Sequence, residues 1–197
     1  MKGKLLFSFT LICFISLQLY LIFFRKDLNF QDIQNGQNIK GTDFIYDIQS
    51  TEIGGTSGTT IEQKVVYLVN PKTGSRFKIS FAVMNADNFY FSETPDGIVC
   101  HRCVDVIHSK NRIYLITRRN GGGSGRYFFH EVLEISDDHV QVLARHLSCG
   151  RAYVRNSEIV FPSRNSKCPK LLPDFDQDAW QYEIFDLSNN LSYVQKD

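Results

Sequence analysis

The sequence lacks an excess of charge of either sign: its 197 residues include 22 Lys and Arg against 21 Asp and Glu. Residues 1–26 hold four basic and no acidic residues, so the remainder has 18 basic and 21 acidic residues. A nucleic-acid-binding domain needs a basic face or stripe, and we therefore exclude nucleic acid as a partner. Tryptophan and methionine are scarce, whereas Phe and Tyr are abundant. That aromatic content is typical of a β-protein.

One segment lacks charge, proline and glycine altogether: residues 5–24 (LLFSFTLICFISLQLYLIFF), preceded by Lys2 and Lys4. Twenty residues in a helix rise about 30 Å, the thickness of the hydrocarbon core of a bilayer. No pair of small residues follows, so the pattern favours an uncleaved anchor, and a cleaved secretory signal is the alternative. We predict one transmembrane helix within 1–26, with the amino terminus in the cytoplasm and the rest in the periplasm, the extracellular space or a lumen.

Residues 27–42 are polar and rich in Asn and Gln, and residues 53–60 (IGGTSGTT) are rich in Gly, Ser and Thr. We interpret 27–62 as a stalk and a loose N-terminal region, with one possible strand at Asp43–Gln49. Residues 63–197 then form the extracytoplasmic β-domain, which is long enough for a core of its own.

From residue 63 onward the pattern is that of strands joined by tight turns. Asn-Pro-Lys-Thr-Gly (70–74) and Thr-Pro-Asp-Gly (94–97) predict such turns, because Pro fixes φ and Gly supplies a positive φ. The segment YFFHEVLE (127–134) lacks strict alternation, but its neighbours favour a strand. The predicted strands are 65–69, 76–84, 88–92, 98–107, 112–117, 127–135, 140–146, 152–154, 158–161, 180–187 and 191–194.

These strands predict an all-β fold, an antiparallel meander that forms a small barrel, a sandwich or a partial propeller-like sheet. The propeller option comes from a weak repeat, since the pattern of residues 111–142 recurs in outline at 156–193. A closed propeller needs at least four blades, and at most three of this length fit the chain. A complete propeller is therefore not expected.

Four cysteines follow the predicted anchor: Cys100, Cys103, Cys149 and Cys168. In an oxidising compartment an even number predicts two disulfides with three possible connectivities, and we favour a Cys149–Cys168 bond. Cys-His-Arg-Cys could instead be a redox pair, but such a site needs a helix directly after it, and the next residues favour a strand. A zinc site built from all four cysteines fits less well, because the second pair lacks a short spacing.

Three carboxylates, Asp174, Asp176 and Asp178, alternate as they do in calcium-binding loops. The glycine expected next is Ala179, and the twelfth position is Phe185, which cannot bind a metal. We interpret the segment as a solvated acidic loop and expect neither a metal site nor a cofactor.

No local motif indicates catalysis. Residues 120–126 (NGGGSGR) lack the following helix and the Lys-Ser/Thr pair of a phosphate loop. The histidines show no metal spacing, and His130 and His146 lie on predicted strands. Glu131 and Glu134 could flank a cleft, although such pairs are common in β-proteins.

The leading hypothesis is a membrane-anchored extracytoplasmic domain that binds a protein, such as a cell-envelope component or a toxin that it neutralises. Binding usually resides in loops carried by rigid strands, and the loops at 119–126 and 162–179 are long. The candidate binding residues are Asn120, Arg126, Asp174, Asp176 and Trp180. One alternative is a glycan- or cell-wall-active enzyme with carboxylates from those loops. A second is a thiol-disulfide protein that uses Cys100 and Cys103.

Overall fold

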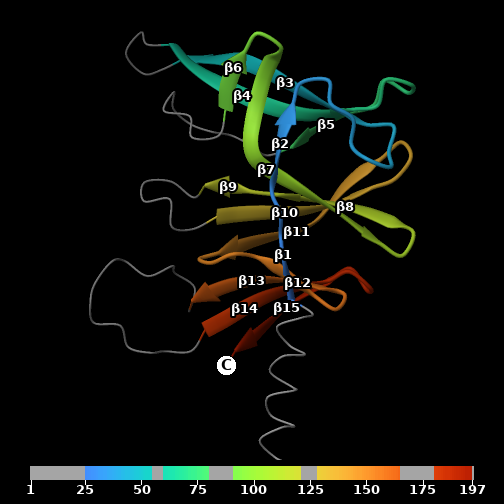
Figure 1. Ribbon diagram of the computed structural model, residues 1–197, viewed down its shortest axis with the longest axis vertical. Coiled ribbons are helices and arrows are strands. Elements are labelled where there is room, and N and C mark those ends of the chain that lie inside the picture. The colour runs from blue at the N-terminus through green and yellow to red at the C-terminus, as the bar shows by residue number, and fades with distance from the viewer. Residues whose placement is uncertain (1–24, 55–59, 80–90, 121–127, 165–179, 197) are drawn as a thin grey trace, which may run out of the picture.

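The computed structural model describes residues 25–54, 60–79, 91–120, 128–164 and 180–196. In these ranges the chain forms antiparallel sheets and no helix, which confirms the predicted all-β class (Figure 1). None of them therefore contains a helix of the length and hydropathy needed to span a bilayer. The predicted anchor at 5–24 lies outside the described residues.

The strands form three sheets, which we call the N-terminal, middle and C-terminal sheets and which lie in layers from top to bottom of Figure 1. The N-terminal sheet has the order β3 (Ile45–Gly54), β4 (Thr60–Val69), β5 (Arg76–Ile79). The middle sheet has the order β11 (Val140–Ser148), β10 (Phe128–Ile135), β8 (Arg112–Thr117), β7 (Gly97–Ser109), β2 (Gln31–Gln34), with β6 (Phe91–Thr94) on β7 and β9 (Arg119–Asn120) on β10. The C-terminal sheet has the order β1 (Arg25–Asp27), β12 (Tyr153–Arg155), β13 (Glu158–Arg164), β14 (Trp180–Asp186), β15 (Leu191–Lys196).

The predicted turns are confirmed where the structure describes them. Between β4 and β5, Asn70 Oδ1 accepts the backbone N–H of Lys72 at 2.9 Å, and Gly74 has a φ of +75°. Between β6 and β7, Thr94 pairs with Gly97, whose φ is +121°. Both glycines occupy the conformation that other residues rarely adopt, which is why the two sequence motifs identified the turns.

Two hydrophobic cores cover the two faces of the middle sheet. On one face, Leu115 and Leu133 pack with residues of the N-terminal sheet, such as Leu68. On the other, Tyr114 and Ile116 belong to a second core with residues of the C-terminal sheet, which include Phe161 and Phe185. Consecutive residues of β8 thus enter different cores. Strands that are buried on both faces read as continuous apolar runs, which explains the missing alternation in β8 and β10.

The small barrel among the predicted architectures is wrong, because none of the three sheets closes on itself within the described residues. The reason lies in the middle sheet, which buries apolar side chains on both faces. Such a sheet is covered by a further layer on each side, whereas a barrel wraps a single face around one core.

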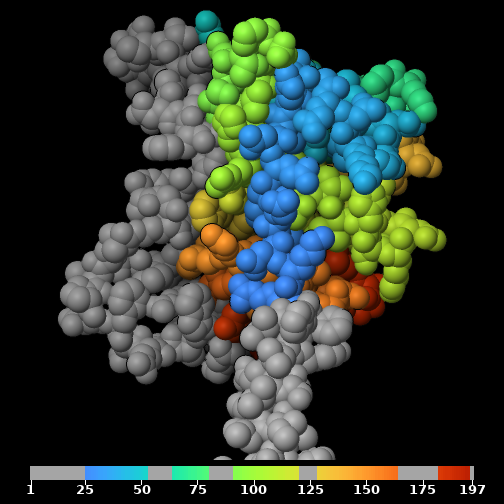
Figure 2. Space-filling view, in the orientation of Figure 1, coloured from blue at the N-terminus to red at the C-terminus, as the bar shows by residue number. Residues whose placement is uncertain are grey.

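The predicted stalk is also corrected. Residues 25–54 contribute one strand to each sheet, β1, β2 and β3 in turn, and lie along the surface of the body in Figure 2. Ile33 and Ile39 are 1% exposed and belong to the first core, and Leu28 and Phe30 pack against the second. This N-terminal segment is therefore a part of the folded domain that ties its three layers together. The loose stretch predicted at 53–60 lies mostly outside the described residues.

Candidate functional site

A cavity of about 470 Å³ opens between the middle and C-terminal sheets, and we call it the inter-sheet pocket. Its walls come from the end of β8, from β9, β10 and β11, and from one residue of β14. The lining residues are Thr117, Arg119, Phe129, His130, Glu131, Arg145, His146, Leu147 and Glu183. Four ionisable pocket side chains come from just two strands, because the β10–β11 register places His130 opposite His146 and Glu131 opposite Arg145.

Two hydrogen-bonded contacts between side chains hold the two glutamates of the pocket. Glu131 Oε1 accepts the Nε–H of Arg145 at 2.8 Å, across the β10–β11 pair. His146 Nδ1 lies 3.0 Å from Glu183 Oε2, which also accepts the backbone N–H of Leu147 at 3.2 Å. Since a carboxylate only accepts, Nδ1 of His146 carries the proton. Glu183 thereby joins the C-terminal sheet to the middle sheet at the base of the pocket.

The two pocket histidines are held by aromatic and polar contacts. The ring of His146 stacks on Phe161, with centroids 4.5 Å apart and planes 14° from parallel. His130 Nδ1 donates to the carbonyl of Thr117 at 2.9 Å, and its Nε2 lies 2.8 Å from Ser148 Oγ. Burial lowers the pKa of His130 to about 3, with smaller contributions from the neighbouring charges. His130 is therefore a neutral, structural wall of the pocket at physiological pH.

Arg119 differs from the other charged groups of the pocket. Its guanidinium lies 4.8 Å from the ring centroid of Phe129, which is 38% exposed. In the part of the chain that the structure describes, no carboxylate pairs with it, whereas Arg145 and His146 each have one. A cation stacked on an aromatic ring is attracted to the ring but is not neutralised by it. The pocket therefore presents a guanidinium that has no carboxylate partner among the described residues, beside a partly exposed apolar ring.

Of the predicted binding residues, Asn120 and Trp180 lie on strands that contribute to the walls of this pocket. Asn120 ends β9, next to Arg119, and Trp180 begins β14, where it pairs with Arg164. The strand ends that border 121–127 and 165–179 lie on one side of the molecule, on the left in Figure 1. Arg126, Asp174, Asp176 and Asp178 lie outside the described residues. Among the described residues no group of His, Cys, Asp and Glu is arranged to hold a metal ion.

Of the two glutamates predicted to flank a cleft, only one lines the inter-sheet pocket. Glu131 does so, whereas Glu134 lies near the other end of β10, where it is 3.4 Å from Arg112. The sequence reasoning did not single out Arg119, although it begins the predicted binding loop 119–126, and it did not name Glu183. Two adjacent arginines stand at 118–119, where the predicted binding loop begins. This local cluster of positive charge is the signal that could have drawn attention to Arg119.

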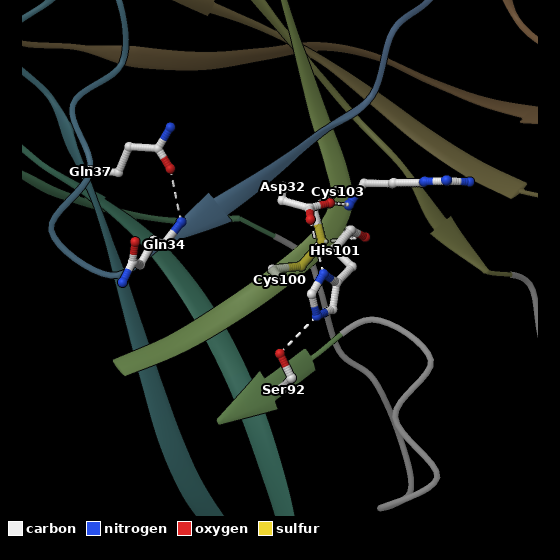
Figure 3. Close-up of a disulfide and its surroundings, with 8 residues drawn as sticks. Asp32, Gln34, Gln37, Ser92, Cys100, His101 and Cys103 are labelled. Atoms are coloured by element: carbon white, nitrogen blue, oxygen red, sulfur yellow. Dashed lines mark hydrogen bonds and ion pairs between the residues drawn. A yellow bond between two sulfur atoms is a disulfide. The ribbon is translucent and has the colours of Figure 1, made fainter. Parts of the chain in front are cut away.

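Cys100 and Cys103 form a disulfide, with their Cα atoms 5.9 Å apart (Figure 3). Both are buried in the first core. The bond spans a bulge in β7, where three residues lie opposite Asp32 of β2 and Arg102 adopts a φ of +49°. The zinc alternative is thereby excluded. Cys149 is also disulfide-bonded, and Cys168, its predicted partner, lies outside the described residues.

A second polar cluster lies beside this disulfide (Figure 3). His101 Nε2 is 2.7 Å from Ser92 Oγ, and its Nδ1 is 3.0 Å from Asp32 Oδ2, the order found in serine-hydrolase triads. In those enzymes the aspartate is buried, whereas the Asp32 side chain is 53% exposed. Asp32 also accepts the N–H of Arg102 at 2.7 Å, and the hydrogen bond from His101 lowers the pKa of Asp32. We assign this cluster to holding the bulge.

Comparison with known proteins reveals no relative: no protein-family model, no curated protein and no solved structure matches the chain. Any functional conclusion therefore depends on the chemistry of the site itself.

Proposed function

We propose that the chain is a membrane-anchored extracytoplasmic domain that binds a protein partner in the inter-sheet pocket, and that the partner places an acidic side chain against Arg119. The observation that carries this proposal is the guanidinium of Arg119, which has no carboxylate partner among the described residues and is stacked on the partly exposed ring of Phe129. Arginine and large aromatic residues are enriched among the residues that dominate binding energy at protein interfaces.

The remaining pocket charges favour a partner of this kind. Glu131 is paired with Arg145, and Glu183 with His146, so these four groups are already satisfied by each other. An approaching carboxylate thus finds the guanidinium of Arg119, whereas an approaching ammonium group finds two glutamates that already accept hydrogen bonds. The cavity volume of about 470 Å³ suits a few side chains of a docked segment. The strand ends at Asn120 and Trp180 border the predicted binding loops, which gives a protein partner more surface than the pocket alone.

The two alternative functions have less support. A glycan hydrolase uses a pair of carboxyl groups as acid and nucleophile or base, and the glutamates of the pocket are engaged by basic side chains instead. A thiol-disulfide protein needs a cysteine that its partner can reach. Cys100 and Cys103 are 0% and 1% exposed and lie in a strand, where attack on either sulfur is blocked.

The test compares two arginine variants of the tagged full-length protein. Arg119→Ala removes the pocket cation, and Arg112→Ala removes an arginine at the start of β8, where it pairs with Glu134. Cells are cross-linked, the protein is purified from membranes, and captured proteins are quantified by mass spectrometry. We expect Arg119→Ala to reduce capture of a specific partner by about tenfold or more, the effect of losing about 1.4 kcal/mol, and Arg112→Ala to leave it unchanged. Equal capture by both variants and the wild type would contradict the proposal.

A further inference from the structure

The C-terminal sheet is joined to the predicted anchor without a linker. The uncharged apolar run ends at Phe24 and β1 begins at Arg25, so the last two residues of the segment predicted at 1–26 belong to β1. β1 is fixed to the sheet, because Arg25 pairs with Arg155 and Asp27 with Tyr153 of β12. Consecutive Cα atoms are only about 3.8 Å apart, so the edge of this sheet cannot lie far from the end of the apolar segment. The stalk that would have separated the domain from a membrane is instead part of the folded body.

The outer face of this sheet carries aromatic and apolar side chains together with charged ones, of which Arg155 and Glu158 pair with each other. Ile159, Phe161 and Phe185 enter the second core, so the alternate residues of each strand face away from the middle sheet. The pairing of β12–β15 places Tyr153, Tyr182 and Tyr193 on that outer face, together with Leu191.

Two of these side chains are strongly exposed, Leu191 at 61% and Tyr193 at 43%. Arg25 lies over the ring of Tyr153, 4.0 Å from its centroid. Tyrosine is enriched where proteins meet the membrane–water interface, and arginine extends its charge from an apolar surface towards the lipid headgroups. The outer face therefore has the residue types of an interfacial surface, next to the point where the anchor joins.

We propose that the outer face of the C-terminal sheet lies against the headgroup region of the bilayer. This inference rests on the proposed function, because it requires the predicted anchor. It also restricts how close to the membrane the partner must come. The inter-sheet pocket lies between the C-terminal and middle sheets, and packed sheets are about 10 Å apart. A partner that enters the pocket must then reach to within about one or two sheet spacings of the membrane surface.

The experiment uses the full chain, with Cys13→Ser as background, reconstituted into phosphatidylcholine vesicles. A fluorescent label is attached at Leu191→Cys on the outer face or at Val142→Cys, a control position on β11 that is 40% exposed. Val142 pairs with Leu133, a residue of the first core, so it points away from the C-terminal sheet. Fluorescence is then measured with and without lipids that carry a nitroxide near the headgroup.

We expect nitroxide lipids to quench the label at 191 by at least about twofold more than the label at 142, which lies a sheet spacing or more further from the bilayer. Equal quenching in vesicles that retain the protein would overturn this inference and leave the anchored function intact. Release of the protein by alkaline extraction would instead overturn the membrane anchoring. If the label at 191 is shielded in detergent and the protein sediments as a dimer, the face belongs to a second copy, and the proposal is wrong.

Discussion

The two interfaces of the middle sheet differ in chemistry. The interface with the N-terminal sheet is mainly apolar and contains the Cys100–Cys103 disulfide, and its buried polar groups are few among the described residues: Asn70, which donates to the carbonyl of Asp137, and Lys64, which pairs with Glu93. The interface with the C-terminal sheet combines aromatic residues with two buried histidines, His130 and His146, and with Ser148. The first is suited to holding the layers together, whereas the second has the polar side chains from which a binding pocket can be built.

The two buried histidines of the polar interface are tolerated because both are hydrogen-bonded. A buried polar group without a partner costs about 1–3 kcal/mol, but His130 contacts both Thr117 and Ser148. His146 contacts Glu183, and its Nε2 lies 3.3 Å from Ser192 Oγ. The geometry of the pocket therefore depends on contacts between sheets as well as within them, and variants on the two sides of the middle sheet should fail in different ways.

The largest effect is expected in the apolar interface. Leu115→Ala removes a fully buried side chain of the first core and should lower the free energy of unfolding by about 2–5 kcal/mol. Denaturant unfolding followed by fluorescence measures the change. Val142→Ala, at an exposed position of the same sheet, is the control and should change stability by less than about 0.5 kcal/mol. A similarly small loss of unfolding free energy in both variants would mean that the first core contributes little to the stability of the fold.

The strands were predictable from sequence largely because turn chemistry is local. Residues 112–117 form a strand with the predicted bounds, and the turns at 70–74 and 94–97 are where Pro and Gly indicated. The N-terminal segment was misinterpreted because its buried residues, such as Ile33 and Ile39, are separated by Asn, Gln and Gly and follow no period. Its first two strands, β1 and β2, pair with residues more than 60 positions away, which no local pattern reveals.

The site was predictable only at its rim. A Gly-rich stretch indicated the loop that follows Asn120, and an acidic stretch indicated the loop that precedes Trp180. Neither stretch indicated the pocket beside these two residues. Its charged residues lie between Arg119 and Glu183, on four strands of two sheets. Strand register and sheet packing decide which of these charged residues are paired with each other, and both follow from the whole fold.

The polar interface should respond to pH through His130. Its pKa is lowered to about 3 in the folded protein, against an ordinary value of about 6.5, so between these values only the unfolded chain binds the proton. Stability is complete above about pH 6.5 and is lost as the pH falls towards 3. From pH 6.5 to 4.5 we expect His130 to account for a loss of about 2 kcal/mol in the free energy of unfolding.

The control for this prediction is His130→Asn, which removes the titrating ring. The variant is less stable at neutral pH, but its free energy of unfolding should fall less steeply with acidification than that of the wild type. Denaturant unfolding at several pH values between 7 and 4 provides the comparison. Parallel curves for the two proteins would show that the buried histidine does not make the polar interface acid-sensitive.

The smallest predicted effect concerns the neighbour of Leu115. Tyr114 faces the polar interface, and the single proton of its hydroxyl is shared between two acceptors, the carbonyl of Leu187 and Asn190 Oδ1, both at 3.0 Å. Tyr114→Phe keeps the ring but removes this link to the β14–β15 turn, and should cost about 1 kcal/mol in unfolding free energy. Tyr67→Phe on β4, whose ring stacks under Arg76, is the matched control and should cost almost nothing. If both variants cost the same, the hydroxyl of Tyr114 does not stabilise the polar interface, and its stability comes from ring packing alone.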